Sequence, residues 1–173
     1  MTRLLRSLAI ACLALNGAGA EARDSVSAFP GLPRSEVQVV TASGTYRFQV
    51  WIAADDRSRE RGLMFVRKLP PDAGMLFLFA RPQFAAFWMK NTYLSLDLVF
   101  IRADGVVVNV AEHARPMTLD PIPSAAPVKA VLELLAGTSA RIGLAAGSLI
   151  LHPALTGASA QQKPRNMVLN NTR

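Results

Sequence analysis

The sequence has little of the chemistry that marks metal proteins and thiol enzymes. Its 173 residues contain one cysteine, Cys12, and two histidines, His113 and His152. Two histidines far apart in the chain, with no third ligand near either, do not predict a metal site. No serine stands in a nucleophile-elbow context, and the glycine-rich segment 137–147 lacks the lysine of a phosphate-binding loop. We therefore expect neither a metal nor another cofactor.

The sequence also lacks an apolar run long enough to cross a bilayer, which takes roughly 20 residues. Its most apolar N-terminal run covers only residues 8–15, follows Arg3 and Arg6, and precedes the small residues Ala18-Gly19-Ala20. This pattern predicts a secretory signal peptide over residues 1–20, cleaved near Ala20. The mature chain would then be periplasmic or secreted, without a membrane span or a cysteine. The alternative is a lipid anchor at Cys12, but Ala9 stands where a larger aliphatic residue is usual.

Acidic residues are fewer than basic ones, and the formal net charge is +7. The basic residues are scattered singly among acids or lie near the C-terminus, whereas nucleic-acid binding calls for a basic stripe with interleaved aromatics. We therefore expect no nucleic-acid partner. The charge instead favours weak association with anionic molecules.

The domain organisation follows from where apolar periodicity begins and ends. Residues 21–34 predict a flexible lead, 35–152 a β-rich domain, and 153–173 a disordered tail. Within the domain, short β-branched and aromatic runs alternate with turn residues, which predicts a mainly β fold with minor α content, a compact sandwich or barrel with one or two short helices. The expected strands are 37–41, 46–52, 74–79, 84–90, 94–102, 106–110, 129–135 and 148–151, with a proline-rich loop over 114–127.

Capping and turn residues predict where the helices and one hairpin lie. Asp55 or Asp56 would cap a short helix that runs to Arg61 and stops at Gly62. The pair Asp104-Gly105 predicts a tight turn. Thr138 would cap a second helix that ends at Ile142.

Several motifs stand in a specific order along the chain. They are Arg61-Gly62-Leu63-Met64, Gly74-Met75-Leu76-Phe77, Phe87-Trp88-Met89-Lys90-Asn91-Thr92, Leu96-Asp97 and Val131-Leu132-Glu133 with Gly137. Over residues 36–151 the chain resembles the bacterial and archaeal family called domain of unknown function 192. The resemblance implies a compact β-rich single domain, often exported, in a family without an established activity. One departure is Gly147-Ser148, where the family commonly carries Gly-Asp.

The segment 84–100 contains polar residues that its apolar surroundings would bury. Burying an unpaired amide or hydroxyl costs about 1–3 kcal/mol, so such a cluster forms either a hydrogen-bond network or a ligand site. Trp88 and Lys90 would share one side of a strand, where they could stack a ring and pair an anion. The candidate ligand-binding residues are Arg61, Trp88, Lys90, Asn91, Thr92, Asp97 and Glu133.

Three functions remain open at this point. The first is a non-enzymatic binding domain for a small polar or anionic molecule or an envelope protein. The second is an envelope hydrolase or lyase with Asp97 and Glu133 as catalytic acid and base, which calls for carboxyls roughly 5–10 Å apart in one cleft. The third is a structural module in which the carboxylates only fasten the fold, by accepting backbone hydrogen bonds or pairing with Arg61 or Lys90.

Overall fold

The structure, a computed structural model, describes residue 29 and residues 31–155. The expected signal peptide, most of the lead and the tail from residue 156 lie outside the described residues. The fold begins slightly earlier than expected, because the first strand, β1, starts at Arg34 and the buried ring of Phe29 lies 4.9 Å from that of Trp51. It also extends to Leu155, which is buried.

Most of the fold is one seven-stranded sheet. The strands are β1 (Arg34–Thr41), β2 (Gly44–Ala53), β3 (Ala73–Gln83), β5 (Leu96–Ile101), β6 (Val107–Ala114), β8 (Val128–Leu135) and β9 (Leu149–Leu151). Their order is β6-β5-β8-β3-β2-β1-β9, and only β2 and β3 pair in parallel. The short strands β4 (Ala86–Phe87) and β7 (Ile122–Pro123) form a separate two-stranded sheet.

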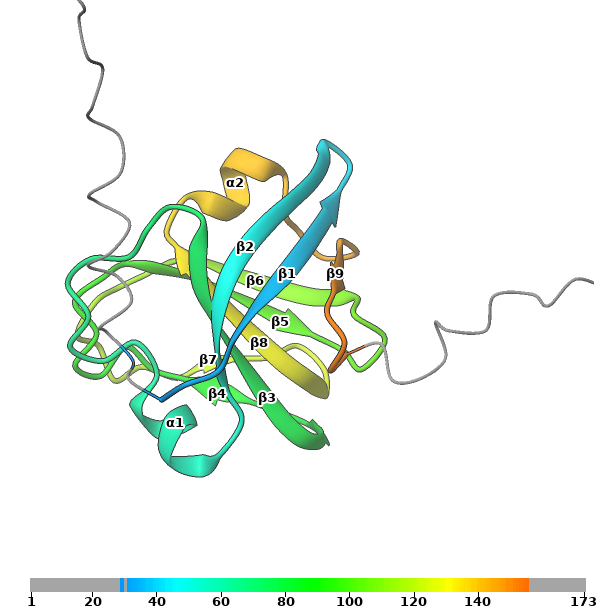
Figure 1. Cartoon of the computed structure of the whole chain (residues 1–173). Coiled ribbons are helices and arrows are strands. Elements are labelled where there is room, and N and C mark those ends of the chain that lie inside the picture. The colour runs from blue at the N-terminus through cyan, green and yellow to red at the C-terminus, as the bar shows by residue number, and fades with distance from the viewer. Residues whose placement is uncertain (1–28, 30, 156–173) are drawn as a thin grey trace, which may run out of the picture.

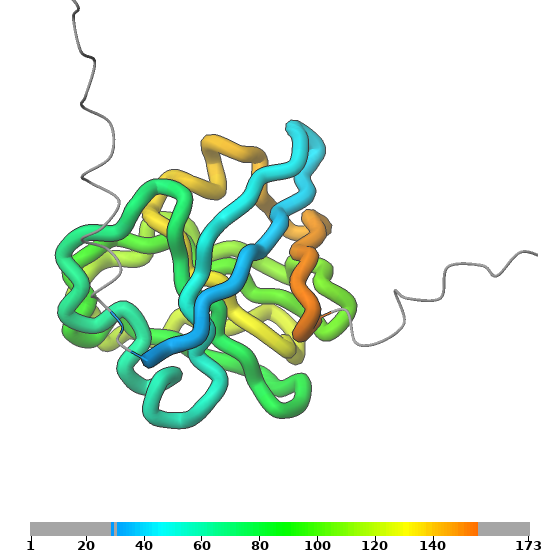
Figure 2. The backbone as a smooth tube through the Cα atoms, viewed as in Figure 1, coloured from blue at the N-terminus to red at the C-terminus, as the bar shows by residue number. Residues whose placement is uncertain are grey.

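The large sheet curls into a half-barrel whose two ends approach each other (Figure 1). An isolated bridge joins Val106 to Leu149, and the backbone N–H of Ile150 donates to the carbonyl oxygen of Gly105 at 2.8 Å. Figure 2 shows β1, β2 and β9 passing in front of β5, β6 and β8. The mainly β, single-domain prediction is thus confirmed, and the architecture is barrel-like.

Apolar side chains fill both faces of this sheet. The inner core contains residues from all seven strands together with Ile142 and Leu144. The outer core lies under the segments 62–69 and 84–92, and includes Met75, Phe77 and Leu98. Successive strand residues point to opposite faces of a sheet. A side chain that packs in the inner core therefore lies on one face, and a side chain that packs in the outer core lies on the other.

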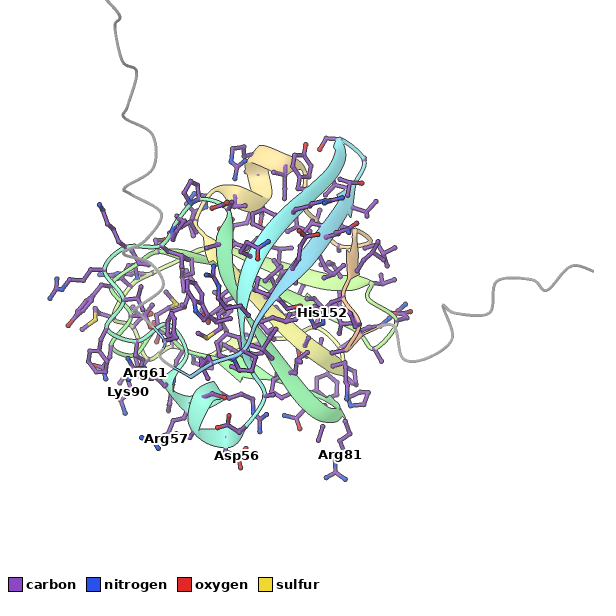
Figure 3. All side chains as sticks on the ribbon, viewed as in Figure 1. Asp56, Arg57, Arg61, Arg81, Lys90 and His152 are labelled. Carbon is purple, nitrogen blue, oxygen red and sulfur yellow. The ribbon has the colours of Figure 1, made fainter. Side chains whose placement is uncertain are left out.

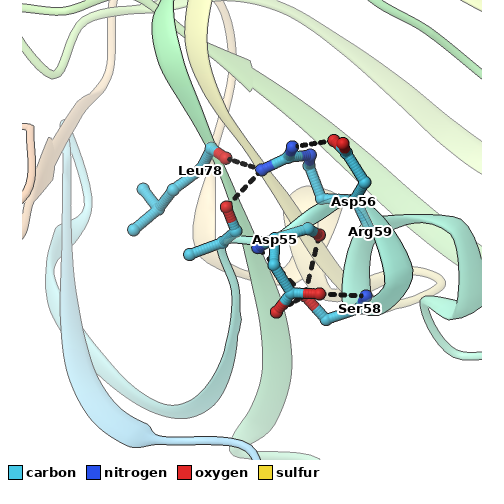
Figure 4. A network of polar contacts seen from close by, with 6 residues as sticks. Asp55, Asp56, Ser58, Arg59 and Leu78 are labelled. Atoms are coloured by element: carbon cyan, nitrogen blue, oxygen red, sulfur yellow. Dashed lines mark hydrogen bonds and ion pairs between the residues drawn. The ribbon is translucent and has the colours of Figure 1, made fainter.

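The first helix, α1 (Asp56–Arg61), forms where the sequence predicts it. The carboxylate of Asp55 accepts from the N–H of Ser58 at 2.9 Å, and the Ser58 hydroxyl accepts from the N–H of Asp55, which completes a capping box. Gly62 ends the helix at φ 46°. The guanidinium of Arg59 donates to the carbonyl oxygens of Ala54 and Leu78, so it fastens α1 to β3 (Figure 4).

The second helix, α2 (Thr138–Ile142), forms as predicted, but the prediction of its cap is wrong. Its N-cap residue is Gly137, in a left-handed conformation with φ 82°, and no side chain of its own caps it. The carboxylate of Asp97 on β5 accepts its first N–H groups instead. A cap supplied from 40 residues away in sequence leaves no local signal.

One predicted strand is largely absent. The segment 84–90 is apolar enough for a strand, but only Ala86–Phe87 pairs, and Lys90 and Asn91 form a turn. Its apolar residues instead cover the outer core, where Met89 is completely buried and Phe87 packs edge-on against Phe77 at 5.0 Å between ring centroids. The segment is therefore a lid over the sheet rather than a full member of it.

Candidate functional site

A cavity of about 330 Å³ lies between the end of α1, strand β3 and the segment 83–88. Its walls combine apolar side chains, among them Leu63, Phe77 and Phe87, with the charged and polar residues at its mouth. Trp88 stands at its edge and is 51% exposed, so this ring is not a core residue. A cavity of this size fits a ligand at the small end of the usual range for protein pockets.

Glu133 on β8 lines this cavity from within the sheet. Its register partners are Met75 on β3 and Leu98 on β5, which are both completely buried in the outer core. The strands approach closely here because residue 74 is glycine: a Cβ at Gly74 would lie 2.5 Å from the carbonyl oxygen of Glu133. The sequence therefore places a carboxyl in the middle of an apolar sheet face.

One oxygen of the Glu133 carboxyl has no hydrogen-bond partner among residues 29 and 31–155. The residue is 5% exposed, and this oxygen is Oε2. Burial in this apolar setting raises the pKa of Glu133 from 4.5 to about 8, because desolvation penalises the charged form. At neutral pH the carboxyl is therefore mostly protonated, and it can donate a hydrogen bond into the cavity.

The cavity mouth carries two arginines with different roles. Arg59 is held by the carbonyl oxygens of Ala54 and Leu78 and by the carboxylate of Asp56. Arg61 is exposed, and within the described part of the chain its side chain makes no hydrogen bond or ion pair. Arg61 is thus the cation at the mouth that remains able to pair with an anionic ligand.

Asp97 lies on the opposite face of the sheet from Glu133. Asp97 is paired in register with Leu134 of the inner core, whereas Glu133 is paired with Leu98 of the outer core. The structure therefore does not bring the two carboxyls into one cleft, and the predicted acid and base pair lacks its geometry. This separation removes the arrangement on which the hydrolase or lyase hypothesis rested.

The partners of Asp97 are backbone groups. Its Oδ1 accepts from the N–H of His113 at 3.0 Å and of Gly137 at 3.2 Å, and its Oδ2 accepts from the N–H of Ser139 at 2.8 Å. Asp97 is fully buried and makes no ion pair with Lys90 or Arg61. It fastens β5 to β6 and to the start of α2, which is a structural arrangement.

The remaining candidates lie around the turn at residues 90–92. Thr92 is buried and lines the cavity, and its hydroxyl donates to the carbonyl oxygen of Lys90 at 3.1 Å. Asn91 adopts φ 54°, the left-handed conformation that asparagine tolerates in turns. The ammonium of Lys90 lies 5.5 Å from the Trp88 ring centroid on the outer surface. Figure 3 shows Arg61 and Lys90 at the same side of the molecule.

Of the seven predicted binding residues, the cavity brings together Arg61, Trp88, Thr92 and Glu133. Lys90 and Asn91 stand beside it, and Asp97 does not belong to it. The sequence analysis missed the aromatic walls, Phe77, Phe79 and Phe87, and the mouth residue Glu60. The signal for the aromatic walls was present, since two motifs of the resemblance contain Phe77 and Phe87.

Residues 29 and 31–155 contain no cluster of three histidine, cysteine, aspartate or glutamate side chains arranged to hold a metal ion. In the same residues, no helix has the length and apolar character that a membrane crossing takes.

Fold and cavity together define a small single-domain protein with a half-barrel sheet and a buried carboxyl that lines a pocket. The chain belongs to the family called domain of unknown function 192, described as an uncharacterised ACR, whose model matches residues 38–152.

Solved structures similar to this chain include the following two. A candidate transcription regulator from Sinorhizobium meliloti 1021 is 43% identical with a TM-score of 0.68, over 69% of this chain and 94% of that one. A protein of unknown function from Novosphingobium aromaticivorans is 37% identical with a TM-score of 0.70, over 71% of this chain and 88% of that one. A search of curated proteins found no match.

Proposed function

We propose that the protein is an exported binding domain whose cavity takes a small ligand with an anionic end. The observation that carries the proposal is the cavity lined by the Glu133 carboxyl, whose Oε2 has no partner in the part of the chain that the structure describes. An unpartnered buried polar group costs stability, so a ligand that accepts its proton in a hydrogen bond would recover part of that loss.

The cavity suggests the order of chemical groups along this ligand. An anionic group would lie at the mouth near Arg61, a flat apolar body against Phe87 and Trp88, and a neutral hydrogen-bond acceptor beside the protonated Glu133. An inward-facing anion is disfavoured, because its charge would be buried beside the neutral Glu133 carboxyl with no cation to pair with it there. Small aromatic carboxylates with a carbonyl or hydroxyl group at the far end fit this description.

The S. meliloti relative is named as a transcription regulator, a role that we do not extend to this chain. The two helices in the described residues have only six and five residues. Neither presents the helical surface with which most motifs read the major groove.

The proposal is tested by NMR titration of labelled protein with 4-acetylbenzoate and a panel of related carboxylates. We expect saturable shifts of the amide signals of Gly62 and Thr92, which flank the cavity. Arg61→Gln should weaken binding roughly threefold to fivefold, because an exposed ion pair contributes about that much to affinity. Arg57→Gln, which removes an exposed arginine of α1 that does not line the cavity, is the matched control. Shifts elsewhere, or equal losses in both variants, would contradict the site.

The export part of the proposal concerns residues that the structure does not describe. It rests on the basic, apolar and small-residue order of segment 1–20. We expect mass spectrometry of the protein from its native cells to find an N-terminus at or near Glu21. An intact Met1, or a lipid on Cys12, would contradict this prediction.

A further inference from the structure

The exposed large apolar side chains of the described residues gather in three segments. All six lie within 61–68, 84–94 and 115–120, and they are Phe65, Phe84, Trp88, Tyr93, Met117 and Leu119. Phe84 is 70% exposed and Leu119 is 63% exposed, so these are not edges of the core. Single exposed apolar residues are ordinary, but a gathering of all of them marks an interaction surface.

Backbone hydrogen bonds join the three segments into one surface, which we call the loop surface. The N–H of Phe65 donates to the carbonyl oxygen of Asn91 at 2.9 Å. The N–H of Met117 donates to the carbonyl oxygen of Thr92 at 3.2 Å, and the N–H of Met89 donates to the carbonyl oxygen of Thr118 at 3.0 Å. The Phe65 and Tyr93 rings meet edge-on, with centroids 6.4 Å apart.

The backbone of the loop surface is strained at the residues that present apolar side chains. Phe65 has φ 66° and Met117 has φ 62°, a left-handed conformation that side chains other than glycine and asparagine rarely adopt. Both residues combine this strain with exposed side chains, 57% and 54% respectively. Strained residues of this kind cluster at functional sites, where a protein contacts something else.

The loop surface is also strongly basic. Its three segments contain one acid, Asp120, and five cations: Arg61, Arg67, Lys68, Lys90 and Arg115. The ion pairs in the described residues involve other arginines, Arg47, Arg59 and Arg102. Arg67 lies 4.4 Å from the Tyr93 ring centroid, and Lys90 lies over Trp88, so aromatic rings and unpaired cations alternate. None of these five cations forms an ion pair among the described residues, so all five remain available to an anionic partner.

We propose that the loop surface docks on a membrane that contains anionic phospholipids. Tryptophan and tyrosine favour the interface between headgroups and acyl chains, and lysine and arginine near it bind anionic headgroups. The exposed aromatic and aliphatic side chains belong to three segments that hydrogen bonds hold together, and the proposal places them in the same membrane interface. The proposal does not depend on the cavity, although Arg61, Phe84 and Trp88 border both.

Vesicle co-sedimentation tests the proposal, with protein purified from its producing cells and its N-terminus determined by mass spectrometry. We expect binding to vesicles of mixed phosphatidylglycerol and phosphatidylcholine at least about tenfold stronger than binding to phosphatidylcholine alone, and weaker in high salt. The double variant Phe65→Asn with Leu119→Ser should lose most of this binding. Asparagine suits the left-handed backbone at residue 65, and neither residue lines the cavity.

Charge is tested separately with Lys68→Gln and Arg115→Gln together, which should weaken binding about tenfold. The control is Arg47→Gln with Arg141→Gln, which changes the net charge equally but outside the loop surface. Failure to bind anionic vesicles, as expected if the partner were an acidic protein, would overturn the proposal. An equal loss of vesicle binding in the control variant would mean that binding is nonspecific charge attraction, which would also overturn the proposal.

The depth of contact gives a second, independent readout. The chain has two tryptophans, and Trp51 is only 2% exposed, so quenching by lipids with brominated acyl chains reports on Trp88. We expect quenching on anionic vesicles in the wild type and in the Arg47 and Arg141 control. Sedimentation without quenching would place the contact elsewhere and refute docking through the loop surface.

Discussion

Asp97→Asn should lower the free energy of unfolding by roughly 3–4 kcal/mol, because the substitution breaks a charge-assisted network at its centre. The asparagine keeps one acceptor oxygen for the N–H groups of His113 and Gly137. Its amide nitrogen would face the N–H of Ser139, so two donors would meet in a fully buried site. Denaturant unfolding of the wild type and the variant measures the loss.

The matched control is Asp104→Asn in the turn between β5 and β6. Asp104 pairs with Arg102 in an exposed site, and such a pair contributes at most about 1 kcal/mol. We expect the control to lose far less stability than Asp97→Asn. Comparable losses, or a stabilised Asp97→Asn, would contradict the structural role and return Asp97 to the candidate binding residues.

This network also corrects the partner that the sequence suggested for Asp97. A buried carboxylate among basic residues favours an ion pair, but the chain provides backbone N–H groups from three separate positions. The N–H of His113 comes from a residue at φ 52°, so the carboxylate also helps to hold a strained backbone. Sequence patterns cannot reveal such partners, because backbone N–H groups are present at every residue except proline.

Much of the fold follows from local sequence. The β1 and β2 hairpin forms because apolar residues alternate on both sides of Ser43-Gly44, and α1 forms between the cap at Asp55 and the stop at Gly62. The segment 84–90 misled the prediction because its apolar residues cover a sheet rather than pair within one. A continuous apolar run does not by itself distinguish these cases.

The separation of Asp97 and Glu133 shows the limit of sequence reasoning about the site. Both residues lie on strands, and β5 and β8 do pair. A shift of one residue in the register of either strand would place both carboxyls on the same face. Register between strands distant in sequence depends on the packing of both cores, including the close approach at Gly74, and no local motif encodes it.

Glu133 makes stability fall as the pH rises, and Glu133→Gln should remove most of this dependence. The pKa of Glu133 is raised from 4.5 to about 8 in the folded chain by burial. Between these values the folded state keeps a proton that the unfolded state has released, so the free energy of unfolding declines across this window. Below this window Glu133 is protonated in both states and costs no stability. Above it Glu133 is ionised in both states, and the full loss in the free energy of unfolding is roughly 3–5 kcal/mol.

The test compares the unfolding free energies of the wild type and Glu133→Gln from about pH 4 to pH 9. The difference between the two proteins isolates the effect of Glu133 from that of His152. Burial lowers the pKa of His152, so this residue acts in the opposite direction and adds stability as the pH rises. Glutamine stays neutral and similar in size, so the variant should gain several kcal/mol on the wild type at the alkaline end. It should show little difference at the acidic end.

Glu60→Gln is the control for this comparison, because it removes an exposed carboxylate at the mouth of the same cavity. It should leave the pH dependence of stability unchanged. A wild type and a Glu133→Gln variant with parallel pH profiles would mean that Glu133 is charged in the folded chain and has a partner there. The cavity would then lack the neutral donor on which the proposed ligand depends, so this measurement bears on the function as directly as on stability.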